Sequence, residues 1–174
     1  MNHKGFHLSV SAISKTKEHS VVAKSAYNSG SKLVSKKTGV IHDYLSKSRE
    51  KILNLVDSDG HKYTKVVEKN LMHSALITPM IAGDITVTRE GFWNDIKQVE
   101  TRKNAQLATE IDVMFPEGIG ANQRISLIEA YSRTLADRYS VLVDVAIHRP
   151  HSHEQHKNNG EVAELTTNTS YQVS

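Results

Sequence analysis

The sequence contains no cysteine among its 174 residues, which excludes a disulfide framework, a thiolate metal site and a cysteine nucleophile. It also lacks any apolar run approaching the ~18 residues of a membrane-spanning helix. Its first ten residues, MNHKGFHLSV, lack the uninterrupted apolar core of a secretion signal. Charged residues make up 24% and apolar residues 38% of the chain, which is typical of a globular domain. We therefore expect a cytoplasmic protein with no membrane partner.

The net charge of +3 is unevenly distributed along the chain. Residues 1–80 carry 13 Lys and Arg against 6 Asp and Glu, whereas residues 81–174 carry 9 against 13. A basic first half could contact phosphate groups, and an acidic second half could hold a metal ion. Lysines also keep an ordinary surface soluble, so charge alone leaves both interpretations open.

Three segments alternate apolar and polar residues, which is the pattern of half-buried β-strands. They are GFHLSVSAIS (5–14), AQLATEIDVMFP (105–116) and SVLVDVAIH (140–148). Their polar positions include His7, Glu110, Asp112, Asp144 and His148. If the strands share a sheet, these residues form one polar face, and helices cover the apolar face. A sheet with one solvated face and no function would show the same pattern.

Helical periodicity marks three other segments. They are VVAKSAYNSG (21–30), with Gly30 as its stop, TREGFWNDIKQVETRK (88–103) and ANQRISLIEAYSRTLADRY (121–139). An inserted hairpin is expected over about residues 50–69, where DSDG separates two β-prone runs. We predict an α+β fold, an antiparallel sheet with helices packed on one face, in a domain of residues 1–153. Residues 154–174 are expected to form a polar, irregular tail.

The third strand leads into a cluster of histidines, with His148 followed by His151 and His153. Two histidines separated by one residue in an extended segment point to the same side. Neutral imidazoles suit Zn, Mn, Ni, Co or Cu, and Glu110 could orient one ligand by accepting a hydrogen bond from its second ring nitrogen. The spacing alone fits a metal site and a solvated polar segment equally well.

Tyr27 lies three residues after Lys24 and between small residues, which leaves its ring open to a ligand. A tyrosine in an amphipathic helix is normally a core or boundary residue. It could also act as a nucleophile, provided that a cation or a metal favours its phenolate.

Five segments cover most of residues 5–148, in the order FHLSVSAIS, SVVAKSAYNSG, KKTGVIHDY, ETRKNAQLATEIDVMFP and VDVAIH. Taken in this order, they resemble the MobA/MobL relaxases, the nickases of plasmid mobilisation and conjugation in the HUH endonuclease class. The resemblance implies that Tyr27 attacks a phosphodiester of single-stranded DNA at an origin of transfer. The expected product is a covalent 5′-phosphotyrosine link with a free 3′-hydroxyl.

The resemblance also implies a divalent metal ion, with Mg or Mn preferred and Zn, Ni or Co also suited. Its expected ligands are His148, His151 and His153, with Glu110 as the acidic residue that orients a histidine. Candidate contacts to the DNA backbone, which should weaken with salt, are Lys15, Lys17, Lys24 and Arg102. Expected protein partners are other relaxosome components and conjugative coupling proteins.

The chain departs from the family pattern after His148. The family places its second and third ligands in a PHAH-like motif several residues later, followed by an apolar strand. Here the pair in RPHSH comes after only two residues and is followed by EQHKNN. Either the loop is shortened and His151 and His153 are the ligands, or the true pair is absent. The second case predicts a truncated, catalytically inactive DNA-binding domain, and a metal-binding protein without a DNA partner is a third alternative.

The inserted hairpin is a second departure from the family pattern. It is either a flap that contacts DNA or a simple insertion. Its lysines, which allow the first interpretation without requiring it, are Lys51, Lys62, Lys65 and Lys69.

Overall fold

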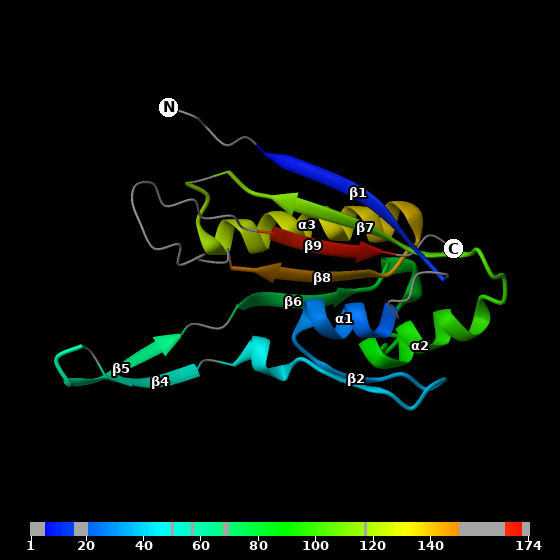
Figure 1. Cartoon of the computed structure of the whole chain (residues 1–174). Helices are drawn as coiled ribbons and strands as arrows, with labels where there is room; N and C mark the ends of the chain where they lie inside the picture. Colours follow the sequence, from blue (N-terminus) through cyan, green and yellow to red (C-terminus); the bar gives the residue numbers. More distant parts are fainter. Residues whose placement is uncertain are drawn as a thin grey trace.

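The computed structural model describes residues 6–15, 21–49, 51–56, 58–67, 70–116, 118–149 and 166–171. Its centre is a five-stranded sheet with the order β1-β7-β9-β8-β6, in which every neighbouring pair is antiparallel (Figure 1). The strands are β1 (His7–Ser14), β6 (Leu71–Ile77), β7 (Gln106–Met114), β8 (Val143–His148) and β9 (Thr166–Tyr171). Among the residues that the structure describes, no helix is long and apolar enough to cross a membrane.

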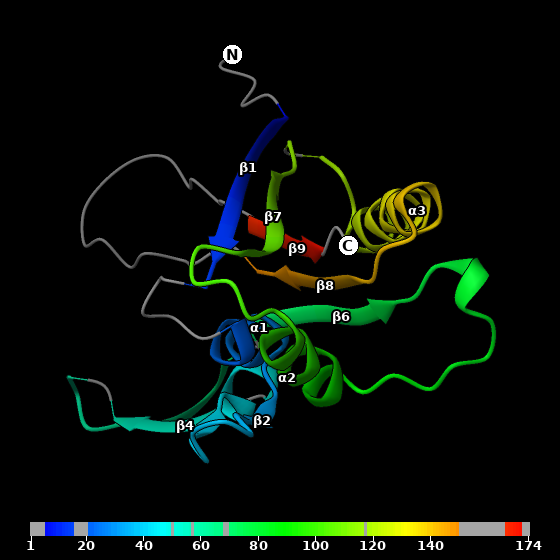
Figure 2. The same cartoon turned by 90° about the vertical axis from the view of Figure 1, so that its right-hand side faces the viewer.

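Helix α3 (Ala121–Tyr139) covers one face of the sheet (Figure 2). Its buried Ile128 and Ala136 share a core with alternate residues of the central strands, namely Ile111, Val113, Val143, Val145 and Ile147. This is the apolar face that the alternation predicts, because successive side chains of a strand point to opposite faces.

Helices α1 (Val21–Ser29) and α2 (Arg89–Val99) pack together on the opposite face. Val22 and Ala26 of α1 and Trp93 of α2 share a second core with residues of β1 and β7. The α+β class and the antiparallel sheet are confirmed, but helices cover both faces rather than the apolar face alone. Alternation could not indicate this, since it shows which strand residues are polar and not whether a helix supplies partners for them.

The expected irregular tail is wrong for residues 166–171, which form the middle strand of the sheet. Strand β9 pairs with β7 on one side and β8 on the other. Its sequence, TTNTSY, has no apolar alternation but is rich in threonine, which favours extended structure. Two neighbours satisfy the backbone groups of a central strand on both edges, so β9 does not need an apolar pattern to pair.

The strand register aligns the polar residues as the alternation predicts. Glu110 of β7 and Asp144 of β8 both lie opposite Ser170 of β9. Because directly paired residues point to the same face, Glu110 and Asp144 share the face on which α1 and α2 pack. His148 lies on that face too, four residues after Asp144 at the end of β8.

Two hairpins extend this frame. The first joins β2 (Lys32–Val34) to β3 (Ile41–Asp43) and leads into the short helix η1 (Leu45–Ser48). The second, β4 (Lys51–Val56) and β5 (Lys62–Val67), projects away from the sheet (Figure 1). The second hairpin confirms the one expected over about residues 50–69. A further short helix, η2 (Met80–Ala82), follows β6.

Candidate active site

Helix α1 presents Tyr27 on its outer side. Val22 and Ala26, which are fully buried, hold the helix against α2 and the sheet. Tyr27 follows Ala26 directly and is therefore turned away from this core, so that 44% of the residue is exposed. The helix thus holds a phenol at a fixed position and leaves it open to a ligand.

The segment after β3 encloses the Tyr27 ring. Tyr44 meets it edge to face, with the ring centroids 5.3 Å apart and an interplanar angle of 82°. The Lys47 Nζ atom lies 2.7 Å from the Tyr27 ring centroid. A cation over the negative face of an aromatic ring is attracted to it, so Lys47 brings a positive charge directly to the phenol.

Hydrogen bonds fix this segment to the end of α1. The Tyr44 amide donates to the Ser31 carbonyl at 3.0 Å, and the Ser48 hydroxyl donates to the Gly30 carbonyl at 3.2 Å. Gly30 has a φ of +57°, a conformation that favours glycine. A Cβ at Gly30 would lie only 3.2 Å from Leu71 Cδ2. The last turn of α1 therefore lies against Leu71, which pairs with His148 in the sheet.

Glu110 is buried beneath α1, with 6% of the residue exposed. The Lys24 ammonium donates to its carboxylate at 2.5 Å, and the Ser11 hydroxyl donates to the same oxygen at 3.4 Å. Lys24 and Tyr27 are one helical turn apart, so the ion pair ties the Tyr27 helix to β7. Burial, reinforced by the nearby Glu110 charge, raises the pKa of Asp112, so the charged form of Asp112 opposes folding at neutral pH.

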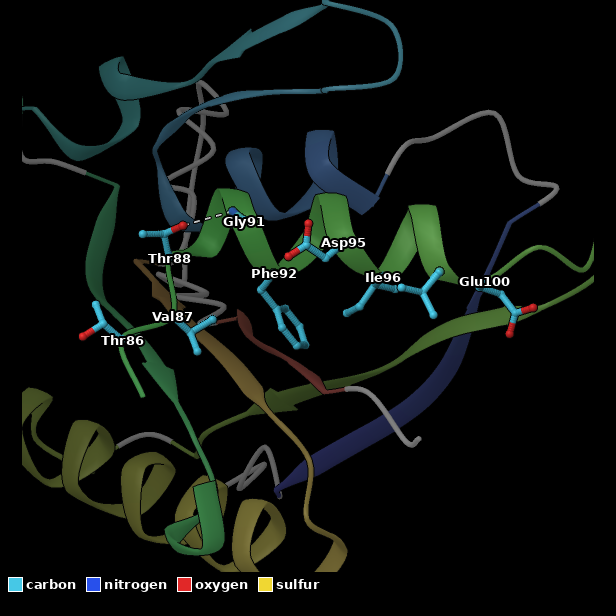
Figure 3. A pocket seen from close by; sticks show the side chains of 9 residues that line it. Thr86, Val87, Thr88, Gly91, Phe92, Asp95, Ile96 and Glu100 are labelled. Carbon is cyan, nitrogen blue, oxygen red and sulfur yellow. Dashed lines mark hydrogen bonds between the residues drawn. The ribbon is translucent and has the colours of Figure 1, made fainter. Parts of the chain in front are cut away.

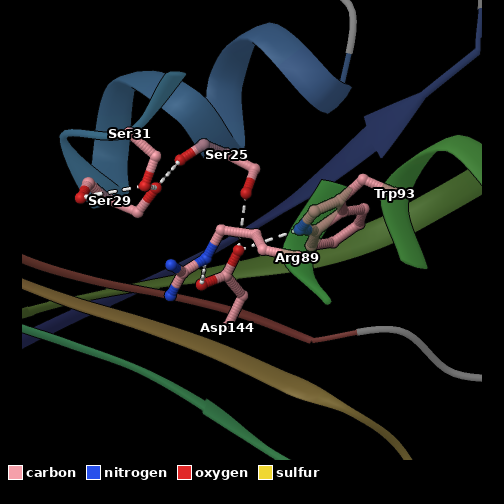
Figure 4. A network of polar contacts seen from close by, with 6 residues as sticks. All are labelled: Ser25, Ser29, Ser31, Arg89, Trp93 and Asp144. Atoms are coloured by element: carbon pink, nitrogen blue, oxygen red, sulfur yellow. Dashed lines mark hydrogen bonds and ion pairs between the residues drawn. The ribbon is translucent and has the colours of Figure 1, made fainter. Parts of the chain in front are cut away.

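Asp144 is the centre of a buried polar network (Figure 4). Its carboxylate accepts hydrogen bonds from the Ser25 hydroxyl at 2.7 Å and the Trp93 indole at 2.8 Å. Arg89 Nε also donates to it, at 2.9 Å. Ser25 belongs to α1, and Arg89 and Trp93 belong to α2. One carboxylate therefore joins both helices to β8, the strand that carries His148.

Only one of the three expected metal ligands lies in the described part of the chain. His148 ends β8 and is 8% exposed, whereas His151 and His153 lie outside the described residues. Among the described residues, no three histidine, aspartate or glutamate side chains are grouped closely enough to hold a metal ion. His148 lies on the same face of the sheet as Glu110.

The expected DNA contacts occupy different environments, and Lys17 lies outside the described residues. Lys24 binds Glu110 and is about one third exposed. Arg102 donates to both carboxylate oxygens of Glu100, at 3.0 and 2.7 Å. That hydrogen bonding lowers the pKa of Glu100 to about 2. Lys15 donates to the Glu100 carbonyl. Lys15 and Arg102 therefore lie close together in the fold, although they are far apart in the sequence.

A groove of about 710 Å³ runs along α2 (Figure 3). Phe92, Ile96 and Val99 form its apolar side, and Thr88 and Gly91 lie at the start of the helix. None of the described residues that line it is an expected catalytic or metal-binding residue. Tyr27, Glu110 and His148 therefore lie outside this groove.

The model of the MobA/MobL family matches residues 47–158, which is more than half of the chain. The chain belongs to the MobA/MobL family. A curated relative, "Mobilization protein MobL" of Acidithiobacillus ferridurans, is 34% identical over 145 residues, which are 83% of this chain and 32% of that protein. The MobA/MobL chain thus spans about a third of the length of this relative.

A solved structure shares the fold of this MobA/MobL protein. It is described as "Molecular Basis of Vancomycin Resistance Transfer in Staphylococcus aureus" and superimposes with a TM-score of 0.69 at 26% sequence identity. The match covers 96% of this chain and 69% of the other. The α+β sheet that the sequence predicts is therefore the fold of a known structure.

Sequence reasoning missed two features of this MobA/MobL site. It assigned no partners to Asp144, although a carboxylate within a strand of Val, Ala and Ile indicates a buried partner. It also assigned no role to Tyr44 or Lys47, which contact Tyr27. Those contacts have no local sequence signal, because they arise from the return of the β2–β3 hairpin to the end of α1.

Proposed function

We propose that this protein is a relaxase that nicks single-stranded DNA at an origin of transfer, with Tyr27 as the nucleophile. The observation that carries the proposal is the setting of Tyr27. An accessible phenol, with a lysine ammonium against its ring, sits on the helix that Glu110 and Asp144 fix to the sheet. Membership of the MobA/MobL family supports the same chemistry.

In the proposed reaction, the Tyr27 oxygen forms a bond to phosphorus and the bond from phosphorus to the 3′ oxygen breaks. The phenol gives up a proton, and the released 3′ oxygen takes one up. The phosphodiester energy is kept in the 5′-phosphotyrosine link, so the strand can be rejoined. Lys47 stabilises negative charge at the phenol oxygen and the phosphate, since a fixed cation stabilises charge that develops in a transition state.

The test is a covalent adduct assay with oligonucleotides that contain the origin of transfer of the host element, in the presence of Mn²⁺ or Mg²⁺. We expect an adduct that survives denaturing electrophoresis and a released fragment with a free 3′-hydroxyl. Failure to form this adduct under any divalent ion would overturn the proposal.

Removal of the Lys47 charge is expected to slow adduct formation without unfolding the protein. Lys47→Gln should reduce the single-turnover rate by about 10-fold, less than the ~10²–10³-fold loss typical of a fully buried transition-state contact. Lys47→Arg keeps a cation over the ring and should retain most of the rate. If Gln and Arg variants react equally, Lys47 acts only through packing.

His148, with His151 and His153, is the ligand set that we assign to a divalent ion. Three imidazoles suit such an ion, and the ion would neutralise charge on the scissile phosphate. His148→Ala should weaken Mn²⁺ binding at least ~100-fold, since loss of even an outer partner of a ligand costs 10- to 100-fold. Isothermal titration calorimetry on the free protein measures this, with His42→Ala as the control. Unchanged affinity in all three ligand variants would disprove the set.

A non-cleaving DNA-binding domain is the second candidate function. It rests on the sequence after His148, where the histidine pair of RPHSH follows after only two residues and EQHKNN stands in place of an apolar strand. This candidate predicts DNA binding without an adduct at any metal concentration, so the same assay separates the two.

A further inference from the structure

A second cationic site lies away from Tyr27. A cavity of about 560 Å³ is bounded by the end of β1, the β2–β3 turn and the second half of α2. Four lysines line it, namely Lys15, Lys36, Lys37 and Lys97, and the remaining lining residues are polar. We call this cavity the lysine pocket. Protein–protein interfaces have apolar and aromatic centres, and none of the described residues that line this pocket is apolar or aromatic.

The charge of the lysine pocket is strongly positive. The carboxylates beside it in the described part of the chain are Glu100 and Asp95. Glu100 is held by Arg102 on both oxygens. Asp95 lies 3.5 Å from Lys36 Nζ, with both side chains more than half exposed, and such a pair is weak. Among the described residues that line or flank the pocket, four lysines and Arg102 are set against these two carboxylates, a net charge of +3 for this group.

Hydrogen bonds of the buried Asn94 side chain and of the turn backbone fix the walls of the pocket. Asn94 of α2 is only 4% exposed. Its side-chain oxygen accepts from the Lys36 amide at 2.7 Å, and its nitrogen donates to the Val34 carbonyl at 2.8 Å. The turn itself is closed by the Gly39 amide, which donates to the Ser35 carbonyl at 2.7 Å. The backbone that carries Lys36 is therefore preorganised, which lowers the entropic cost of binding a ligand.

The same hairpin joins the lysine pocket to the Tyr27 site. Lys36 and Lys37 lie in the β2–β3 turn, and Tyr44 and Lys47 follow β3 at the base of the hairpin. In Figure 1 the β2–β3 turn lies beside the first turn of α1, and η1 lies beside its last turn. Tyr27 belongs to that last turn. The hairpin therefore runs alongside α1 with a cation at each end.

We infer that the lysine pocket binds phosphates of the same DNA strand, several nucleotides from the phosphate that Tyr27 attacks. Lysines neutralise phosphates without reading bases, and the described lining residues include no aromatic side chain on which a base could stack. The contact should therefore add affinity that is independent of sequence and sensitive to salt. The identity of the polyanion rests on the function proposed above.

The experiment measures single-stranded DNA binding by the full chain by fluorescence anisotropy over a range of salt concentrations. The probe is an oligothymidine of about 30 nucleotides, longer than the ~4–16 nucleotides of one binding fold. For Lys36→Gln/Lys37→Gln we expect about 5- to 10-fold weaker binding at low salt. The slope of log K against log salt should become shallower by about 1.4, since each single-strand phosphate contact contributes about 0.7.

The matched control is Arg133→Gln/Arg138→Gln on α3, which removes the same charge from the opposite face of the sheet. The arginine variant should change the slope by less than half as much as the lysine variant does. Thermal unfolding of both variants serves as the control for correct folding. Equal slopes in the two variants would overturn the inference. It would also be overturned if the lysine variant lost binding to a poly-glutamate peptide and kept its DNA affinity.

The two proposals fail separately. A slope change confined to the lysine variant, with no adduct from the wild type, would support phosphate binding by the lysine pocket and disprove the nickase function. An adduct from the wild type, with no slope change in the lysine variant, would support the nickase function and disprove phosphate binding by the lysine pocket.

Discussion

Tyr27→Phe is expected to abolish the covalent DNA adduct, with a loss of at least about 10³-fold, limited by detection. Removal of an enzyme nucleophile costs up to about 10⁶-fold, and phenylalanine has no oxygen that can bond to phosphorus. The measurement is the adduct band from single-turnover reactions with the origin oligonucleotide.

The fold should not change in this variant. Tyr27 is 44% exposed, and a phenylalanine ring keeps the edge-to-face contact with Tyr44 and the contact with Lys47. We expect the free energy of unfolding to stay within about 0.5 kcal/mol of the wild type, as for most exposed substitutions. DNA binding should likewise be retained.

Tyr44→Phe is the matched control, because its ring lies 5.3 Å from that of Tyr27. It should form the adduct at close to the wild-type rate. A full adduct yield from Tyr27→Phe, or a loss confined to Tyr44→Phe, would show that Tyr27 is not the nucleophile.

Asp144→Ala should produce the largest loss of stability, about 3–5 kcal/mol, as is typical when one partner of a buried ion pair is removed. Arg89, whose side chain is 17% exposed, would keep its charge without its carboxylate. Trp93, which is 1% exposed, would lose the acceptor for its indole N–H. The free energy of unfolding from urea denaturation measures the loss.

Two further variants define the origin of this effect. Arg89→Met/Asp144→Leu removes both charges and should recover much of the loss, since replacing a buried ion pair by apolar residues is often neutral or stabilising. Asp95→Asn, which breaks the exposed pair with Lys36, should cost no more than about 0.5 kcal/mol. A loss below about 1 kcal/mol in Asp144→Ala would mean that the network adds little stability.

The Asp144 network also connects stability to the proposed chemistry. It holds α1, and with it Tyr27, against the strand that ends in His148. Asp144→Asn preserves the shape of the side chain but removes the charge that Arg89 requires. If Tyr27 is the nucleophile, as proposed, the folded molecules of this variant should therefore form the DNA adduct more slowly than those of the wild type, because the helix that carries Tyr27 is less firmly positioned.

The sequence by itself determined the strands β1, β7 and β8, the helices α1, α2 and α3 and the β4–β5 hairpin. It also placed Glu110, Asp144 and His148 on one face. These are local properties, because side-chain alternation, helical periodicity and turn residues act over a few neighbouring positions. The stop of α1 at Gly30 was predictable for the same reason, since a positive φ favours glycine.

Only the tertiary structure decided which residues meet across the fold. Glu110 binds Lys24, 86 positions away, and Asp144 binds Ser25, 119 positions away. The lysine pocket joins residues of β1, a hairpin turn and α2. Strand β9 lies in the centre of the sheet because two neighbouring strands satisfy its backbone, not because of its own pattern. Such contacts depend on register and packing, which no short stretch of sequence specifies.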